Sequence, residues 1–252
     1  MYQAQIDINC DMGESHGHFV VGNDTTIFPY ITSSNIACGF HAGDPWHMRQ
    51  SIRAALHHGV RIGAHPGFPD LNGFGRQYMD IPSEQLTAQV AYQIAAIDGV
   101  ARSLGGKLAY VKPHGALYNA VASKEKEAAA VIQAIQEMDV GLALMGLAGS
   151  LIEEMAQVKQ VPFIPEAFAE RRYESNGQLR SRRKKEAVIH DPEVAARQVV
   201  RMVLQEEVES FSGEILSLKA RSICIHGDNP AAVSILKAID DAFIRHQIKK
   251  SA

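Results

Sequence analysis

A strand-like run that ends in acidic residues opens the chain, and it reads Ile6-Asp7-Ile8-Asn9-Cys10-Asp11-Met12-Gly13-Glu14. Four further apolar runs also end at polar residues that precede a helical pattern. The polar residues at or after the ends of these runs are His41 and Asp44, His65 and Asp70, Lys112 and His114, and His226 and Asp228. In parallel α/β proteins the strand fixes the backbone and the loop after it presents the functional side chain. Five such clusters indicate an enzyme.

Strand and helix patterns alternate along the chain. The predicted strands span residues 4–10, 32–38, 60–64, 107–112, 140–145, 161–164 and 221–225. Helix starts are marked by Asp44-Pro45, Ser83, Ser123, Ser150, Asp191-Pro192 and Asn229-Pro230. This order implies right-handed crossovers and a parallel sheet. Polar residues follow most strands, and no Gly-rich first turn for a dinucleotide is present, so an α/β fold of the (β/α) barrel type, with seven strands, is favoured over an open sheet. We predict a single barrel domain over residues 1–252.

Composition limits the classes of partner. A formal net charge of −3 over 252 residues gives no electrostatic case for nucleic acid. No apolar run approaches the ~18–20 residues of a membrane span, and no signal-peptide pattern is seen, so we expect a cytoplasmic protein without a membrane partner. The three cysteines, Cys10, Cys38 and Cys224, lie in apolar runs and are interpreted as small buried thiols.

Two connections exceed the ~2–6 residues usual between such elements. The first runs from Pro66 to Pro82, where three glycines supply flexibility around Arg76, and the second runs from Pro165 to His190 and is rich in Arg and Lys. Loops of this length are binding loops, lids or partly disordered segments. The run from Arg180 to Lys185 is consistent with a solvated face or with a basic lid over a phosphate.

Alternation along the first strand places Asp7, Asn9 and Asp11 on one face, which points into a barrel interior. Buried carboxylates are costly unless they are paired or bind metal. Two interpretations remain open. Asp7 and Asn9 form a structural hydrogen-bond network and Asp11 caps a turn, or Asp11 and Glu14 serve as acid/base groups or metal ligands.

Histidines follow the next two strands. His41 precedes a helix start that favours a bound anion, whereas Asp44 is read as the N-cap of that helix. His65 is fixed by the proline that follows it. Asp11, His41 and His65 together form a possible three-ligand site for a divalent metal, although their spacing is not diagnostic.

Lys112-Pro113-His114-Gly115 is the sharpest local signal. A lysine at the end of a buried strand is costly to desolvate and is well placed to neutralise a carboxylate, a phosphate or a developing oxyanion. The alternative is that Lys112 extends to the rim while His114 caps a turn. No GxxxxGK[ST] phosphate loop, G-x-S-x-G elbow or CxxC motif is present.

These motifs, together with Ser34-Asn35-Ile36-Ala37-Cys38-Gly39-Phe40-His41, Gly73-Phe74-Gly75-Arg76 and Ile225-His226-Gly227-Asp228, resemble the LamB/YcsF family over nearly the whole chain. The resemblance implies a seven-stranded barrel related to glycoside hydrolases and polysaccharide deacetylases. It also implies a hydrolase of a cyclic amide C–N bond, converting 5-oxo-L-proline to L-glutamate with ATP and Mg²⁺ as co-substrate, in a complex with subunits B and C. Glu170 stands where the family pattern has Asp.

Clustering at strand ends yields the candidate residues. We predict catalytic roles for Asp11, Glu14, His41, Lys112 and His114. Lys112 would hold the amide or phosphate oxygen, Asp11 or His41 would activate water, and His114 or Glu14 would protonate the leaving nitrogen. Substrate or phosphate binding is predicted for Asn9, Asn35, His65, Arg76, Glu166, Arg171, His226 and Asp228.

Two other functions fit the same residues. One is a metal-dependent hydrolase of amides or acetylated sugars that needs no ATP, as the ring of His and Asp residues suggests. The other is a non-catalytic subunit that binds a small-molecule substrate while a partner performs the chemistry. The sequence leaves open whether the chain forms a homo-oligomer.

Overall fold

A closed barrel of parallel strands forms the centre of the molecule. The computed structural model describes residues 4–138 and 141–252. Within this part of the chain, seven strands pair in the order β1-β2-β3-β4-β5-β6-β9, and β9 pairs back to β1. Their bounds are β1 Ala4–Met12, β2 Ser33–Ala37, β3 Arg61–His65, β4 Leu108–Val111, β5 Ala143–Leu147, β6 Phe163–Phe168 and β9 Ser222–Ile225. The predicted parallel barrel is therefore confirmed.

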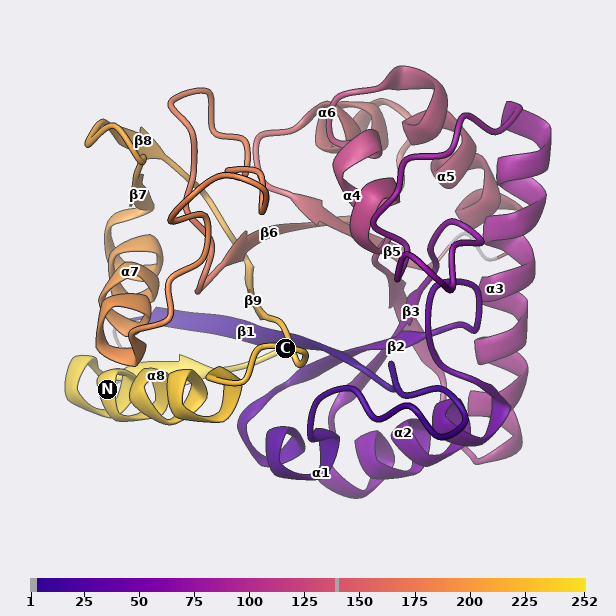
Figure 1. The fold of residues 1–252 in the computed structure, drawn as a ribbon, viewed down its shortest axis with the longest axis horizontal. Helices are drawn as coiled ribbons and strands as arrows, with labels where there is room; N and C mark the ends of the chain where they lie inside the picture. The colour runs from indigo at the N-terminus through magenta and orange to yellow at the C-terminus, as the bar shows by residue number, and fades with distance from the viewer. Residues whose placement is uncertain (1–3, 139–140) are drawn as a thin grey trace.

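Helices surround the barrel, with α3 along one edge and α7 and α8 side by side on the opposite side (Figure 1). The long helices are α2 Pro45–His58, α3 Ser83–Ser103, α5 Glu125–Met138, α7 Pro192–Gln205 and α8 Ala232–His246. The shorter ones are α1 Asp24–Ile27, the 3-10 helix η1 Phe28–Tyr30, α4 Gly115–Val121 and α6 Leu151–Val158. No helix in the described residues is long and apolar enough to cross a membrane.

Most predicted elements are present within a few residues of their expected bounds. Helix α2 begins after Asp44, whose side chain accepts hydrogen bonds from the backbone N–H groups of Trp46 and His47, so the predicted N-cap is confirmed. The predicted fifth strand starts ahead of Ala143, where β5 begins, and its first residue, 140, lies outside the described residues. The predicted sixth strand, 161–164, was placed too early, because β6 continues to Phe168 and carries Glu166 into the barrel.

Several short elements were not predicted. These are α1, η1, α4, the antiparallel pair β7 Glu207–Glu209 and β8 Ile215–Ser217, and β10 Ile248–Lys250, which pairs with the start of β1. Helix α4 starts at Gly115, a residue that normally argues against a helix. The helix predicted from Ser123 begins at Glu125 instead. Such short elements carry too few apolar positions to show a period.

The interior of the barrel holds polar side chains as well as apolar ones. Asp7, Asn9 and Asp11 of β1 are all buried, as the two-residue alternation predicts. From β4, the ring of Tyr110 crosses the interior over β3. A Cβ atom on Gly63 would lie 2.3 Å from that ring, so a glycine at this position is what admits the tyrosine. The polar interior continues upward into the C-terminal mouth of the barrel.

Candidate active site at the barrel mouth

A buried lysine lies at the centre of the mouth. Lys112 follows β4 and is only 2% exposed. Its Nζ lies 2.9 Å from Asp11 Oδ1, 2.9 Å from Glu166 Oε1 and 3.1 Å from Cys224 Sγ. These partners come from β1, β6 and β9, on other sides of the barrel. A buried ammonium ion is tolerated only when it is paired and hydrogen-bonded, and Lys112 meets both conditions.

Amides and hydroxyls complete this layer. Asn35 Nδ2 donates to Asn9 Oδ1 at 2.7 Å and to Asp11 Oδ1 at 2.8 Å, while the hydroxyl of Tyr110 donates to Asn35 Oδ1 at 2.6 Å. Asn9 Nδ2 in turn donates to Glu166 Oε1 at 2.8 Å. We call Asn9, Asp11, Asn35, Tyr110, Lys112 and Glu166 the lysine layer. It is a connected network that fixes one position for the ammonium group.

The charges in the lysine layer support one another. Burial alone would raise the pKa of Asp11, but the His65 ring and the Lys112 ammonium outweigh burial and hold that pKa well below its usual value. Burial would likewise lower the pKa of Lys112, and the carboxylate of Asp11 above all raises it instead. Asp11 is therefore an anion and Lys112 a cation in the folded protein.

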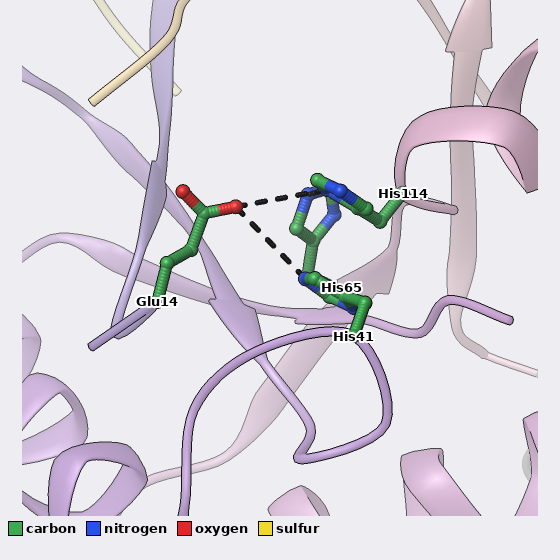
Figure 2. A group of neighbouring side chains, drawn as sticks. All are labelled: Glu14, His41, His65 and His114. Atoms are coloured by element: carbon green, nitrogen blue, oxygen red, sulfur yellow. Dashed lines mark hydrogen bonds and ion pairs between the residues drawn. The ribbon is translucent and has the colours of Figure 1, made fainter. Parts of the chain in front are cut away.

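A second group of buried side chains comes from four successive strand ends. Glu14 follows β1, His41 follows β2, His65 ends β3 and His114 follows β4, and each is at most 5% exposed. Their side chains point toward one another (Figure 2), and one ligand-type atom from each lies within 4.8 Å of the others. We call these four residues the histidine cluster. The sequence predicted all four as functional residues but not as one group.

Backbone carbonyls orient two of the three rings. His65 Nδ1 donates to the carbonyl of Lys112 at 2.7 Å, and His114 Nε2 donates to the carbonyl of Phe74 at 2.9 Å. The other nitrogens, His65 Nε2 and His114 Nδ1, then face each other at 3.0 Å. Burial lowers the pKa of His114 and of His41 well below the usual value, which favours neutral rings.

The first long loop packs closely on the histidine cluster. A Cβ atom on Gly67 would lie 2.7 Å from His41 Nδ1, and one on Gly75 would lie 2.7 Å from His114 Cδ2. Gly67 and Gly75 thus allow the backbone of this loop to approach the rings, a more specific role than the flexibility that the sequence suggested.

A cavity of about 650 Å³ opens above both groups. Asp11, His65, Lys112 and His114 contribute to its floor, and residues of the two long loops form its walls. A volume of this size suits a small-molecule ligand. Glu14 and His41 are not among the residues that line this cavity, whereas His65 and His114 are.

Cations surround the cavity. Arg76 Nη2 pairs with Asp228 Oδ2 at 2.5 Å across the mouth. Arg171 is 7% exposed; its Nη2 donates to the carbonyl of Arg180 at 2.5 Å, and its Nε has no hydrogen-bond partner in the described part of the chain. Burial and, next, Arg182 lower the pKa of Arg171 to about 10. Arg171 is a buried cation facing space, which suits an anionic ligand.

The remaining predicted residues also lie at the mouth. His226 lines the cavity, and its ring nitrogen Nδ1 contacts the carboxylate of Glu170. Residues 181–186 are all exposed, and Ser181, Arg182 and Arg183 among them also line the cavity, so this run combines a solvated face with part of the cavity wall. Arg180, just before it, pairs with Glu174.

Sequence reasoning missed four residues that contact the site. Tyr110 and Cys224 belong to the surroundings of Lys112, Ser222 accepts a hydrogen bond from Asn9, and Glu170 holds His226. The signal for Tyr110 was present, because it lies two residues before Lys112 and shares its face of the strand. The same reasoning places Ser222 and Cys224 on one face of β9. The three cysteines are all buried free thiols, as expected.

Fold and site together define a parallel β/α-barrel protein with a polar, enzyme-like site at the C-terminal mouth. More particularly, the chain belongs to the LamB/YcsF family, whose model matches residues 6–252. A protein of Acinetobacter baumannii, named as the A subunit of 5-oxoprolinase, is 47% identical over 244 residues, covering 97% of this chain and 96% of the relative. Its name places that relative in an enzyme of more than one subunit.

Solved structures agree with this assignment. The crystal structure of the lactam utilization protein from Thermus thermophilus matches with a TM-score of 0.93 and 42% identity, covering 98% of this chain and 99% of that one. A family 4 carbohydrate esterase from Streptomyces lividans matches with a TM-score of 0.52 and 10% identity, covering 100% of this chain and 94% of that one. The second likeness shows the barrel fold alone.

Proposed function

We propose that this chain is the A component of an ATP-dependent 5-oxoprolinase and opens the lactam ring of 5-oxo-L-proline to give L-glutamate. The single observation that carries the proposal is Lys112, a buried ammonium held by two carboxylates on the floor of a cavity of about 650 Å³. The names of the relatives supply the substrate class.

The proposed reaction requires cationic side chains and proton-transferring side chains, and both kinds line the cavity. A five-membered lactam is a poor electrophile, so we propose that its oxygen first attacks the γ-phosphorus of ATP, which forms an O–P bond and releases ADP. Water then adds to the ring carbon, the C–N bond breaks as the nitrogen takes a proton, and a glutamyl phosphate results. Hydrolysis of that acyl phosphate yields glutamate and inorganic phosphate. Each step places negative charge on oxygens.

Lys112 lies where those oxygens would be held. Its position is set by the lysine layer, so no reorganisation is needed when charge develops. Asp11 accepts from Lys112 and from Asn35 through Oδ1, and we therefore assign it to fixing the lysine rather than to activating water. Arg76 and Arg171 add cations at the walls, where they suit the carboxylate of the substrate or a phosphoryl oxygen.

Proton transfer is assigned to the histidine cluster. His65 and His114 line the cavity, and His65 Nε2 lies 3.4 Å from Asp11 Oδ2, which connects the two groups. Neutral imidazole is the usual side chain for proton transfer at neutral pH. ATP with Mg²⁺ serves as co-substrate of the assembled enzyme, whose other components we propose to be subunits B and C.

The proposal is tested by 5-oxoproline-dependent ATP hydrolysis, measured with the chain alone and with subunits B and C added. We expect glutamate and ADP in equal amounts in the complete mixture only. Lys112→Met in an assembled complex should abolish this turnover. The matched control is Lys107→Met, because Lys107 is exposed at the opposite end of the same strand region. Turnover that persists in Lys112→Met, or lactam opening without ATP, would contradict the proposal.

A further inference from the structure

The histidine cluster contains more lone pairs than donors. His65 Nδ1 and His114 Nε2 carry protons, because each contacts a carbonyl oxygen. In neutral rings the facing nitrogens, His65 Nε2 and His114 Nδ1, are then both bare acceptors only 3.0 Å apart, and His65 Nε2 also lies 3.4 Å from a third acceptor, Asp11 Oδ2. Two acceptors do not approach to this distance unless a proton or another cation lies between or beside them.

The surroundings of Glu14 distinguish a shared proton from a metal ion at this position. Its Oε1 is buried, has no hydrogen-bond partner in the described residues, and lies 3.6 Å from His114 Nδ1. One proton shared by the two rings would leave this buried oxygen without a hydrogen bond, at a cost of about 1–3 kcal/mol. A metal ion bound by all three atoms satisfies both rings and the carboxylate.

We propose that Glu14, His65 and His114 bind a divalent transition-metal ion of the Zn²⁺ type, with an open coordination position toward the cavity. Two imidazoles and a carboxylate are a ligand set that suits such an ion and leaves room for a further ligand. Ligands of a tetrahedral ion with bonds of about 2.0 Å lie roughly 3.3 Å apart. The observed separations of 3.0 and 3.6 Å lie on either side of that value.

The contacts behind the rings are those of a metal site. Ligating histidines usually donate their second ring N–H to a carbonyl or carboxylate, which fixes the tautomer that leaves the lone pair free. His65 and His114 both do this through the carbonyls of Lys112 and Phe74. The bound ion would supply a Lewis acid beside the cavity, and the proton transfer assigned above to the histidine cluster would then pass through water at the open position rather than through the two ligand rings.

This ligand set differs from the trio predicted from sequence. His41 stacks face to face on His114, with ring centroids 3.8 Å apart and an interplanar angle of 3° (Figure 2). An ion in the plane of His114 therefore lies outside the plane of His41, where that ring has no lone pair to offer. Asp11 is not among the side chains whose ligand atoms converge at this point, and its Oδ1 is already occupied by Lys112 and Asn35. His41 thus acts as a positioning residue that packs on the ligand His114.

Metal binding is tested on the purified full-length chain without ATP, substrate or other subunits, so its outcome is independent of the proposed reaction. After removal of metal by a chelator, the protein is titrated with Co²⁺, and binding is followed by visible absorption. We expect one equivalent to bind with the intense bands of a four-coordinate ion, and Zn²⁺ to displace it.

Variants locate the site. Glu14→Gln and His114→Ala should each weaken Co²⁺ binding by at least about 100-fold. The double variant His57→Ala/His58→Ala, which removes an exposed histidine pair, should bind as the unmodified chain does. Circular dichroism establishes whether each variant is folded. If His114→Ala does not fold, the conservative variant Glu14→Gln still tests the site. Absence of stoichiometric binding, or loss of binding only in the His57/His58 variant, overturns the proposal.

Discussion

The lysine layer and the histidine cluster lie next to each other at one end of the same barrel, yet they differ in how their polar atoms are satisfied. In the lysine layer the ammonium of Lys112 contacts two carboxylates, and Asn35 links Asn9 to Asp11. In the histidine cluster, Glu14 Oε1 and both nitrogens of His41 have no hydrogen-bond partner within the described residues. Both groups are almost fully buried.

This contrast separates two uses of buried polarity. A fully hydrogen-bonded network specifies one arrangement and fixes the position of a charged group. Removal of any member therefore leaves a buried polar partner without its hydrogen bond or counter-charge. An unsatisfied cluster costs stability until something binds, and it therefore indicates a ligand. Substitutions should accordingly have opposite consequences for stability in the two groups.

The largest effect is expected for Lys112→Met. The variant leaves the carboxylates of Asp11 and Glu166 buried without their cation, and breaking a buried pair in this way costs about 3–5 kcal/mol. Urea denaturation measures this loss. Because the stranded charge is the cause, adding Glu166→Gln to Lys112→Met should restore part of the stability. A double variant no more stable than Lys112→Met would show that the loss comes from packing instead.

A matched pair of carboxylate-to-amide substitutions, one in the lysine layer and one in the histidine cluster, tests the difference between the two groups directly. Asp11→Asn removes an anion that Lys112 and Asn35 contact, so we expect a loss of about 1.5–3 kcal/mol, the range for hydrogen bonds to charged groups. Burial raises the pKa of the Glu14 carboxyl well above its usual value, so in metal-free protein Glu14→Gln replaces a group whose charge is already disfavoured, and stability should stay constant or rise. Equal losses in the two variants, measured by urea denaturation after chelation, would remove the distinction between the groups.

A smaller loss is expected when the lysine layer is disturbed through its neighbour. Gly63→Ala places a Cβ atom 2.3 Å from the ring of Tyr110, which must then move away from Asn35. Overpacking of this kind costs about 1–3 kcal/mol. The control is Gly99→Ala, since Gly99 lies within α3 and a Cβ there meets no atom within 4 Å. That control should gain about 0.5–1 kcal/mol from helix propensity. A Gly63→Ala variant as stable as the parent chain would show that Tyr110 has room to shift.

The sequence predicted the barrel because a period of two on the strands and helix starts at Asp44-Pro45 and Asp191-Pro192 are local signals. It also predicted most of the polar residues of the mouth, since they lie in the C-terminal part of a strand or just after it. It did not predict how they divide into two groups. That division depends on contacts across the barrel, such as Glu166 with Lys112, and on Gly63 admitting Tyr110, which are properties of the closed sheet. Glu170 was noted as a departure from the family pattern, but its contact with His226 arises only when two distant loops meet.

The smallest effect concerns a carboxylate that is satisfied but not deeply buried. Asp44 caps α2 through Trp46 and His47, and its side chain is 18% exposed. Burial would raise the pKa of Asp44, but the N–H groups of Gly17 and His47 and the ring of His47 hold it well below its usual value. Asp44→Asn keeps a capping oxygen and removes only the charge, so near pH 6 we expect a loss of about 0.3–1 kcal/mol.

The pH dependence of this loss identifies the charge as its cause. Because the pKa of Asp44 is lower in the folded than in the unfolded chain, its contribution is complete above the unfolded value of about 3.9 and is lost as the pH falls toward the folded value. The stability gap between the parent chain and Asp44→Asn should therefore be narrower at pH 3 than at pH 6 in urea denaturation. A gap that stays constant would assign the loss to cap geometry. A satisfied carboxylate would then matter for its charge in the interior of the barrel and for its hydrogen bonds alone at the surface.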